Sequence, residues 1–358
     1  MKNFKLKIKW ANLCFNLMMA GIIALVTGFN PVLCFGGSLV AGVALGYVNN
    51  TAEHLAFMAI QKEIWEADIV GNLYKNNEFL TYAFNADQYV LQGKVVHIPN
   101  AGTAPDVSKN RSSVPATVSD RTDVDITYNL DEYTSDPIRI PNADTVELSY
   151  DKRQSVTSEA QSKLREVVAE NMLVNWAPAS AAVIKTTGDA TAATAPSATG
   201  NRKLFALANL KSAMTQLNKD GLPQEGRYSL FSANMYDQLI EAMTATQYRD
   251  FSAAFDPKTG ILGKLYGFNI LMRSTVLVYD NSYAVKAVGA AGATTDNEAV
   301  LCWQMNSVER ALGDVTFFED IANPLYYGDI YSFLIRMGGR IRRNDKKGVL
   351  VIAQDTAS

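Results

Sequence analysis

Hydrophobic residues along this chain keep helical spacing in some blocks and strand spacing in others, and the block Gly226–Thr275 shows both. Arg227–Phe231 predicts a short strand, and Ser232 predicts the N-cap of the helix that follows it. That helix places its apolar residues at helical spacing, at Met235, Leu239, Ile240 and Met243. Three glycines then interrupt the chain before Phe268–Met272, which predicts another strand. The block supplies no nucleophile, base or metal-ligand set, so we interpret it as a packing unit.

The clearest helix is predicted over Thr157–Trp176, and Pro178 stops it. Its apolar stripe covers about five turns, or about 30 Å, and consists of Ala160, Leu164, Val168, Met172 and Trp176. A further helix is predicted over Arg202–Asn218. Between the two helices, Ala177–Lys203 is rich in Ala, Thr, Gly, Ser and Pro, which predicts a mobile loop or a domain hinge.

Short strands separated by polar residues and prolines are predicted before the long helix, at Lys94–Ile98, Asp123–Leu130, Pro137–Pro141 and Val146–Tyr150. Ribbons with so little apolar content cannot hold a core of their own, so we expect an extended hairpin loop that needs a neighbour. The acidic residues of this stretch are Asp123, Asp125, Asp131 and Glu132. We interpret them as the solvent-exposed side of an amphipathic strand. A calcium site or an acid/base pair is the alternative, and the lack of an EF-hand loop around these residues speaks against calcium.

After the packing unit, strands are predicted at Val276–Tyr279 and Val300–Trp303, on either side of a flexible Gly/Ala-rich hairpin end. Ser307–Leu312 predicts a short helix, and strands follow at Val315–Phe318, around Ile330–Met337 and at Val349–Ala353. A dense basic cluster lies on the predicted turn before the last strand, at Arg340, Arg342, Arg343, Lys346 and Lys347. Such a cluster is usually a solvated face, and we also consider it a candidate contact to a neighbouring subunit or to phosphate.

The N-terminal segment 1–50 begins with four lysines and then has no charged residue up to its end. It contains two apolar arms, Ala11–Phe29 and Val32–Val48, each approaching the ~20 residues that cross a bilayer. Three hypotheses compete: a membrane hairpin or signal segment, a start or leader absent from the mature protein, and an apolar arm buried in an assembly. After it, Thr51–Leu91 combines a helical pattern (Phe57, Ile60, Ile64 and Ala67 on one face) with many aromatics.

The composition of the chain excludes more classes of function than any single motif does. The chain has 358 residues, 48% of them hydrophobic and 19% charged, and a net charge of −3, so no global basic field attracts nucleic acid. Its two histidines are far apart, and its three cysteines have no metal-site spacing. We therefore expect no cofactor, no metal site and no enzyme activity.

The order of these elements resembles the major capsid protein of tailed bacteriophages, which has the Hong Kong 97 fold. The resemblance covers about Glu53 to Ala353. Its most telling residues are Gly226-Arg227-Tyr228 leading into Met235–Leu239, and Gly263–Phe268 leading into a strand.

This resemblance implies an α+β fold with an N-arm (51–92), an extended loop (93–150), a peripheral domain with its spine helix and a mobile loop (151–202), an axial domain (203–318), and the return strands and tail of the peripheral domain (319–358). The apolar N-terminal segment (1–50) departs from the family's pattern, because such capsid proteins often begin with a charged scaffolding segment that is later cleaved. The alternatives for this segment are that it is retained, cleaved or membrane-associated. It implies self-assembly as pentamers and hexamers into an icosahedral shell around double-stranded DNA. Portal, scaffold or decoration proteins are the further partners, and the expected location is the virion, assembled in the bacterial cytoplasm. The alternatives are an encapsulin-type compartment shell and a membrane-anchored surface or binding protein.

Overall fold

The computed structural model divides into two units, Met1–Ala67 and Asp68–Ser358, and the residues that it describes belong to the second unit. The described residues are 73, 77–91, 94–100, 107, 109–112, 118, 124–141, 152–343 and 345–357. The predicted apolar segment 1–50, the helical pattern at Phe57, Ile60, Ile64 and Ala67, and the predicted strand Val146–Tyr150 lie outside the described residues.

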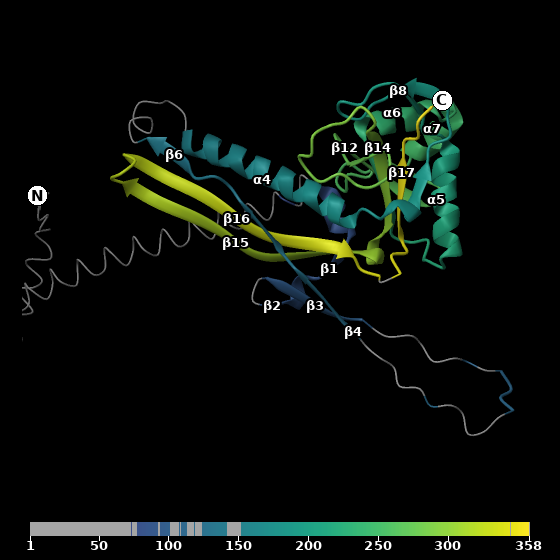
Figure 1. Ribbon diagram of the computed structural model, residues 1–358, viewed down its shortest axis with the longest axis horizontal. Helices are drawn as coiled ribbons and strands as arrows, with labels where there is room; N and C mark the ends of the chain where they lie inside the picture. The colour runs from purple at the N-terminus through teal and green to yellow at the C-terminus, as the bar shows by residue number, and fades with distance from the viewer. Residues whose placement is uncertain are drawn as a thin grey trace, which may run out of the picture. The chain divides into compact units, whose positions relative to one another are not determined.

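A mixed sheet of seven strands is the centre of what we call the α/β lobe, residues 177–307 and 345–357 (Figure 1). Its order is β11 (Gly263–Leu265), β12 (Phe268–Arg273), β10 (Arg227–Ser232), β14 (Asn297–Gln304), β17 (Val349–Ala353) and β7 (Val183–Lys185), with β13 (Leu277–Tyr279) beside β14. Strand β10 is parallel to β12 and antiparallel to β14. The strands that the sequence predicted at Arg227–Phe231, Phe268–Met272 and Val349–Ala353 are thus confirmed.

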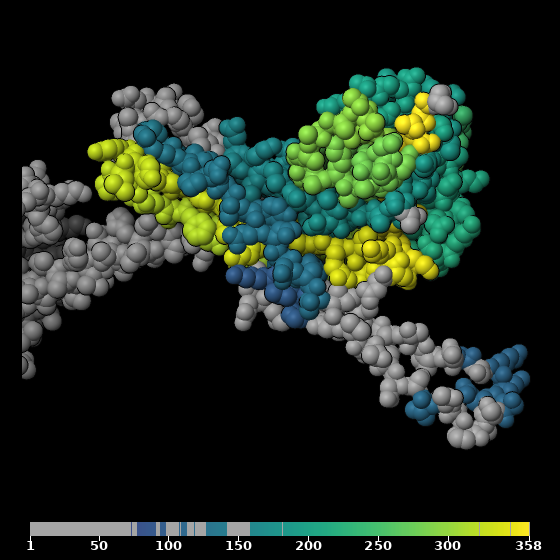
Figure 2. Space-filling model, viewed as in Figure 1, coloured from purple at the N-terminus to yellow at the C-terminus, as the bar shows by residue number. Residues whose placement is uncertain are grey.

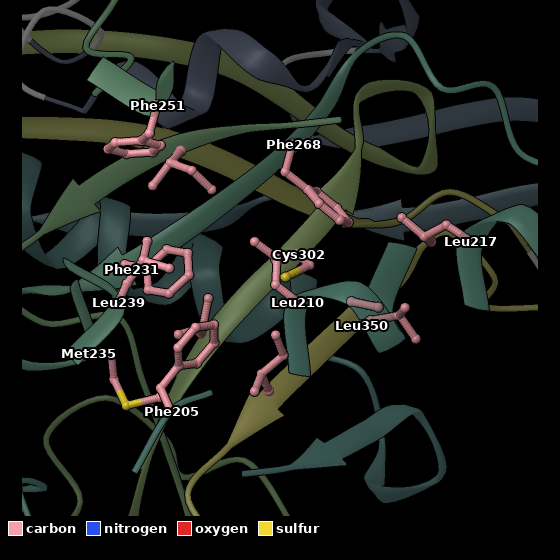
Figure 3. Close-up of a cluster of buried hydrophobic side chains, with 14 residues drawn as sticks. Phe205, Leu210, Leu217, Phe231, Met235, Leu239, Phe251, Phe268, Cys302 and Leu350 are labelled. Atoms are coloured by element: carbon pink, nitrogen blue, oxygen red, sulfur yellow. The ribbon is translucent and has the colours of Figure 1, made fainter. Parts of the chain in front are cut away.

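Three helices pack on one face of this sheet: α5 (Leu207–Lys219), α6 (Ala233–Glu241) and α7 (Ala245–Ser252). Helix α6 begins where the sequence predicted, because the Ser232 side chain accepts a hydrogen bond from the Met235 backbone N at 3.3 Å. Figure 3 shows the core between these layers, in which helix residues such as Leu210 and Leu239 meet strand residues such as Phe231 and Cys302. This core lies within the lobe and needs no other copy.

The opposite face of the sheet packs on aromatic residues from distant parts of the chain. The Tyr228 ring is stacked between Tyr82, at 4.2 Å between ring centroids, and Trp303, at 5.8 Å. The Trp303 indole N–H donates to the Tyr82 backbone O at 2.8 Å, and its ring lies 6.0 Å from that of Trp176. Trp176 is the last residue of α4 (Lys152–Trp176). These contacts hold the 3₁₀ turn η1 (Glu78–Tyr82) and the end of α4 against the sheet.

A long antiparallel hairpin, β15 (Val308–Asn323) and β16 (Gly328–Ile341), runs beside α4 (Figure 1). Three short strands extend this second sheet: β1 (Phe84–Asn85) on β15, and β5 (Asp131–Thr134) and β6 (Ile138–Pro141) on β16. Helix α4 starts five residues before the predicted Thr157 and ends where predicted, with Leu164, Val168, Met172 and Trp176 buried.

Residues 90–129 contribute a small three-stranded sheet, which we call the ribbon: β2 (Val90–Leu91), β3 (Val95–Asn100) and β4 (Val124–Asn129). Its register pairs Val95 with Asn129 and Asn100 with Val124. The strands predicted at Lys94–Ile98 and Asp123–Leu130 are therefore confirmed within one or two residues, and so is their pairing as an extended hairpin.

The predicted helix at Ser307–Leu312 is wrong, because these residues continue from the turn η4 (Met305–Ser307) into β15. Val308 pairs with Ile341 and Leu312 pairs with Met337 on β16, and Val308 and Ala311 are fully buried. A six-residue segment gains little from helix formation, so the long-range strand pairing decides its structure.

The loop predicted over Ala177–Lys203 contains regular structure: a 3₁₀ turn η3 (Ser180–Ala182), β7, and a small hairpin of β8 (Ala190–Ala192) and β9 (Asn201–Lys203). Val183 and Ile184 pair with Val351 and Ile352 of β17. These two apolar residues, in a segment otherwise rich in Ala, Thr, Gly, Ser and Pro, therefore extend the sheet. The following helix starts at Leu207 and not at the predicted Arg202, whose side chain is buried and donates to Asn297 Oδ1 at 2.7 Å.

Candidate assembly surfaces

The end of the β15–β16 hairpin carries an exposed apolar patch, which we call the hairpin tip. Its members and their exposed fractions are Phe318 50%, Ile321 47%, Leu325 82%, Tyr326 52% and Tyr327 79%. Monomeric proteins rarely expose so many large apolar side chains side by side, and such patches are typical of contacts with other proteins.

Buried aromatics support the hairpin just before this tip. The Phe317 ring stacks on Tyr331 at 5.7 Å and lies 5.2 Å from Phe333, and all three side chains are buried. Tyr327, in the turn, has a φ of +50°, which few residues other than glycine adopt. The buried aromatics therefore hold the hairpin, and with it the exposed side chains of the tip, in a fixed arrangement.

The ribbon is the second element that is poor in buried surface. Among the side chains that the structure describes, its core cluster has four buried residues, Ala86, Val96, Leu130 and Ala311, of which Ala86 precedes the ribbon and Ala311 belongs to the hairpin. On the connection between β3 and β4, Val107 is 97% exposed and Val118 is 90% exposed. The described side chains of the ribbon therefore contribute little buried apolar surface. That the extended loop needs a neighbour stays a prediction.

The ribbon and residues 77–91 are attached to the first residues of the hairpin, at a place that we call the joint. The Ala86 backbone N donates to the Arg310 backbone O at 2.8 Å, and Asp87 Oδ1 accepts from the Leu312 backbone N at 2.7 Å. The Arg342 guanidinium lies 3.9 Å from the centroid of the Phe84 ring. The joint thus ties chain segments more than 200 residues apart.

A carboxylate is buried at the centre of the joint. Glu309 on β15 is fully buried, and the Arg340 Nε on β16 lies 3.3 Å from its Oε1. Neither carboxylate oxygen has a hydrogen-bond partner in the described part of the chain. Burial therefore raises the pKa of Glu309 to about 7, although Arg340 and Arg342 act in the opposite direction. The joint contains a group that titrates near neutral pH.

The structure divides the five predicted cationic residues into two groups. Arg340 contacts Glu309 and lies 5.7 Å from the Tyr128 ring, and Arg342 contacts Phe84, so these two belong to the joint. The other three lie on the turn before β17, where Arg343, Lys346 and Lys347 are exposed. Here Arg343 holds Asp345 through two hydrogen bonds of 2.9 and 2.8 Å and lowers the pKa of that carboxyl to about 2.

The acidic residues of the ribbon region make no metal site in the described part of the chain. No group of three or more His, Cys, Asp or Glu side chains is placed there to hold a metal ion. Glu132 on β5 instead pairs with Arg336 of β16 at 2.7 Å, and Arg336 also pairs with Asp314 at 3.2 Å. Asp123 lies outside the described residues. No helix among the described residues is long and apolar enough to cross a membrane.

Solved structures provide the matches to known proteins. No protein-family model matches this sequence, and no curated protein matches it. The capsid structure of the cyanophage P-SCSP1u aligns with 77% of this chain and 87% of its own chain, at 20% identity and a TM-score of 0.54. The capsid of Ralstonia phage GP4 aligns with 77% of this chain and 88% of its own chain, at 13% identity and a TM-score of 0.55.

This chain has the fold of phage capsid proteins. The capsid of an empty GTA particle shares that capsid fold, with 78% of this chain and 90% of its own chain aligned, at 12% identity and a TM-score of 0.52. The α+β class that the sequence predicted is therefore confirmed, and so is the resemblance of its element order to the phage capsid fold. The low identities explain why this likeness is seen in the structure and not in the sequence comparisons.

Sequence reasoning did not single out the hairpin tip of this capsid fold as an exposed patch. A signal was present, because Leu325-Tyr326-Tyr327 places three apolar residues between Pro324 and Gly328, at the end of two predicted strands. Turns are usually polar, so apolar residues there indicate contact with something else. Glu309 gave no such signal, because only the strand pairing shows that it is buried.

Proposed function

We propose that this chain is the major capsid protein of a phage, and that copies of it assemble into the icosahedral shell around a double-stranded DNA genome. The observation that carries the proposal is the capsid fold itself, which aligns with nearly nine-tenths of each of the two phage capsid chains described above. The exposed hairpin tip and the weakly buried ribbon support it, since both are surfaces that other copies would cover.

Within this proposal, the parts of the chain have the roles that its resemblance to capsid proteins implies. Residues 51–92 are the N-arm and 93–150 the extended loop that lies over an adjacent subunit. The long helix α4 and strand β16 lie in the peripheral domain (151–202 and 319–358). Residues 203–318 form the axial domain, whose tips meet at pentamer and hexamer centres, and β15 crosses from one domain into the other. Assembly takes place in the bacterial cytoplasm, and the product is the virion shell.

Electron microscopy of the purified chain tests the proposal, and we expect closed particles or capsomers. The variant Leu325→Ser/Tyr327→Ser removes two of the most exposed apolar side chains, so its subunits should fold and fail to form complete shells. The matched control, Leu325→Met/Tyr327→Phe, keeps the apolar surface and should assemble. A chain that stays monomeric under all assembly conditions would contradict the proposal.

A further inference from the structure

A groove of about 860 Å³ runs along α5 at the edge of the α/β lobe. Helix α5 forms one wall, and the segment from Pro178 to Ile184, with edge strand β7, and the turn 345–350 form the other. In Figure 1, α5 lies at the outer side of the lobe, beside β17. The space-filling view in Figure 2 shows the same lobe as one compact body of side chains. Nothing in the proposed function uses this groove.

The groove combines an apolar floor with a basic rim. Ala182, Ile184 and Leu350 contribute to the floor, where they pack on the lobe's hydrophobic core. The rim carries four lysines, two from α5 and two from the turn: Lys211, Lys219, Lys346 and Lys347. All four are exposed, and within the described part of the chain none of them forms an ion pair with a carboxylate.

Of the described residues, only two carboxylates line the groove beside these four lysines, Asp220 and Asp345, and the charge of Lys347 acts on Asp345. Asp345 is already held by the guanidinium of Arg343. Asp220 accepts a hydrogen bond from the Gln216 side chain at 3.4 Å, on the same helix face. The groove therefore presents an excess of positive charge around an apolar floor, and it fits a segment with an apolar face and acidic flanks.

We propose that this groove binds residues 53–68 of a second copy of the chain. The segment EHLAFMAIQKEIWEAD supplies Phe57, Ile60 and Ile64 at helical spacing. Its charged residues are Glu53, Lys62, Glu63, Glu66 and Asp68, which give an acidic excess opposite in sign to that of the rim. The lengths also agree, because 13-residue α5 is about 20 Å long and a helix over residues 53–68 is about 24 Å long.

A second copy supplies this segment more directly than the same copy. The chain enters the α/β lobe through Phe79 and Tyr82, which pack against Trp176 and Tyr228. These residues lie on the face of the sheet opposite to α5, since Tyr228 and Ser229 alternate along β10 and Ser229 contacts the core residue Cys302 at 3.0 Å. The chain's own N-arm would have to pass around the edge of the sheet to reach its own groove.

The apolar floor distinguishes this ligand from nucleic acid. A groove for the DNA backbone needs cations and other donors that contact phosphates, and buried apolar side chains add nothing to those contacts. An amphipathic peptide uses both the floor and the rim. The inference rests on the proposed function for the presence of a neighbouring copy, and DNA in the groove is an outcome that would overturn it.

Cysteine cross-linking between two full-length variants tests the inference. One variant carries Ile64→Cys and the other carries Thr215→Cys, which lies on the exposed side of α5 in the groove. Both contain Cys14→Ser and Cys34→Ser, since the third cysteine, Cys302, is buried. Mixed before assembly and oxidised, the two should form a disulfide between residues 64 and 215 of different chains, identified by mass spectrometry.

Charge reversal on the rim provides the control. Lys211→Glu/Lys219→Glu in the groove-side variant should reduce the cross-link about tenfold, and Glu63→Lys/Glu66→Lys in the other copy should restore it. The matched control Lys258→Glu/Lys264→Glu changes two exposed lysines outside the groove and should leave the cross-link unchanged.

Electron microscopy of the same samples separates the two proposals. Particles without the cross-link would overturn this inference and leave the proposed function intact, whereas absence of particles would contradict the proposed function. A cross-link formed only within one chain, in a doubly substituted copy diluted with unsubstituted ones, would overturn the exchange between copies. Protection of the thiol introduced by Thr215→Cys by duplex DNA, in place of the cross-link, would overturn the peptide as the ligand.

Discussion

At the scale of single residues, the joint between the hairpin and the ribbon depends on a few buried groups. The Trp176 indole N–H donates to the Glu309 backbone O at 3.0 Å, and the Glu309 side chain faces Arg340. These contacts connect the end of α4 to both strands of the hairpin. The sequence could predict that Trp176 is buried, from its place in the apolar stripe. It could not predict that Glu309 is, because a charged residue becomes buried only through its distant partners.

The raised pKa of Glu309 makes the stability of this joint depend on pH. In the folded chain the carboxyl holds its proton up to about pH 7, and in the unfolded chain only up to its ordinary pKa of 4.5. The folded state therefore binds more protons between these values, so the contribution of Glu309 to stability falls as the pH rises from about 4.5 to 7. Each pKa unit corresponds to about 1.4 kcal/mol.

We expect Glu309→Gln to remove this dependence. The melting temperature of the unassembled wild-type subunit should fall, relative to that of the variant, between pH 5 and pH 8, as measured by differential scanning calorimetry. The control Glu319→Gln changes an exposed carboxylate on the same strand and should leave the pH profile of the wild type unchanged. Parallel profiles for the wild type and Glu309→Gln would contradict the assignment.

The glycine pair on β16 gives another test of the joint. A Cβ on Gly339 would lie 2.5 Å from the Met172 Cε and 3.0 Å from the Trp176 Nε1, in addition to a clash with the Glu309 backbone O. A Cβ on Gly338 would lie 2.9 Å from a Leu130 methyl, the far end of a side chain, and 3.3 Å from the Leu130 Cα, so its contacts are less severe. We expect Gly339→Ala to lower the unfolding free energy by about 1–3 kcal/mol and Gly338→Ala by clearly less, in chemical denaturation. Equal effects would contradict this packing.

At the scale of elements, the sequence predicts those whose burial is local. Helix α6 and strand β10 form where apolar spacing and the Ser232 cap place them, and the end of α4 follows from Pro178. Elements that depend on distant pairing were missed or misassigned. The sequence predicted a helix for the first residues of β15, because their pairing with β16 cannot be seen in the local sequence. It likewise placed β7 in a loop, because the pairing of β7 with β17 is also long-range.

The ribbon gives a prediction at this scale. Because Val107 and Val118 are almost fully exposed, the double substitution Val107→Ser/Val118→Ser removes little buried surface from the folded subunit. We expect the unfolding free energy of this variant to stay within about 0.5 kcal/mol of the wild type. Its assembly should be lost or strongly reduced, as measured by sedimentation. A variant that assembles normally would show that the extended loop is not a contact between subunits.

At the scale of the whole molecule, the chain combines a part that has its own hydrophobic core with parts that expose apolar side chains. The α/β lobe has a complete core, with fourteen buried residues in one cluster. The described side chains of the ribbon form only a small buried cluster, and the hairpin tip and the described residues between β3 and β4 expose apolar side chains. Sequence patterns indicated this difference for the ribbon, since its strands are short and its apolar residues few. They did not place the groove, because its four lysines come from segments more than 120 residues apart.

The account's central claim is that the apolar surface left exposed by one chain is buried by other copies. Hydroxyl-radical footprinting of the hairpin tip, in unassembled subunits and in purified particles, measures this burial directly at Leu325, Tyr326 and Tyr327. We predict strong oxidation of these residues in the subunit and several-fold protection in the particle. Tyr248, which is 47% exposed on α7, provides an internal reference for the dose in the subunit. Equal oxidation of the tip in subunits and particles would contradict the claim.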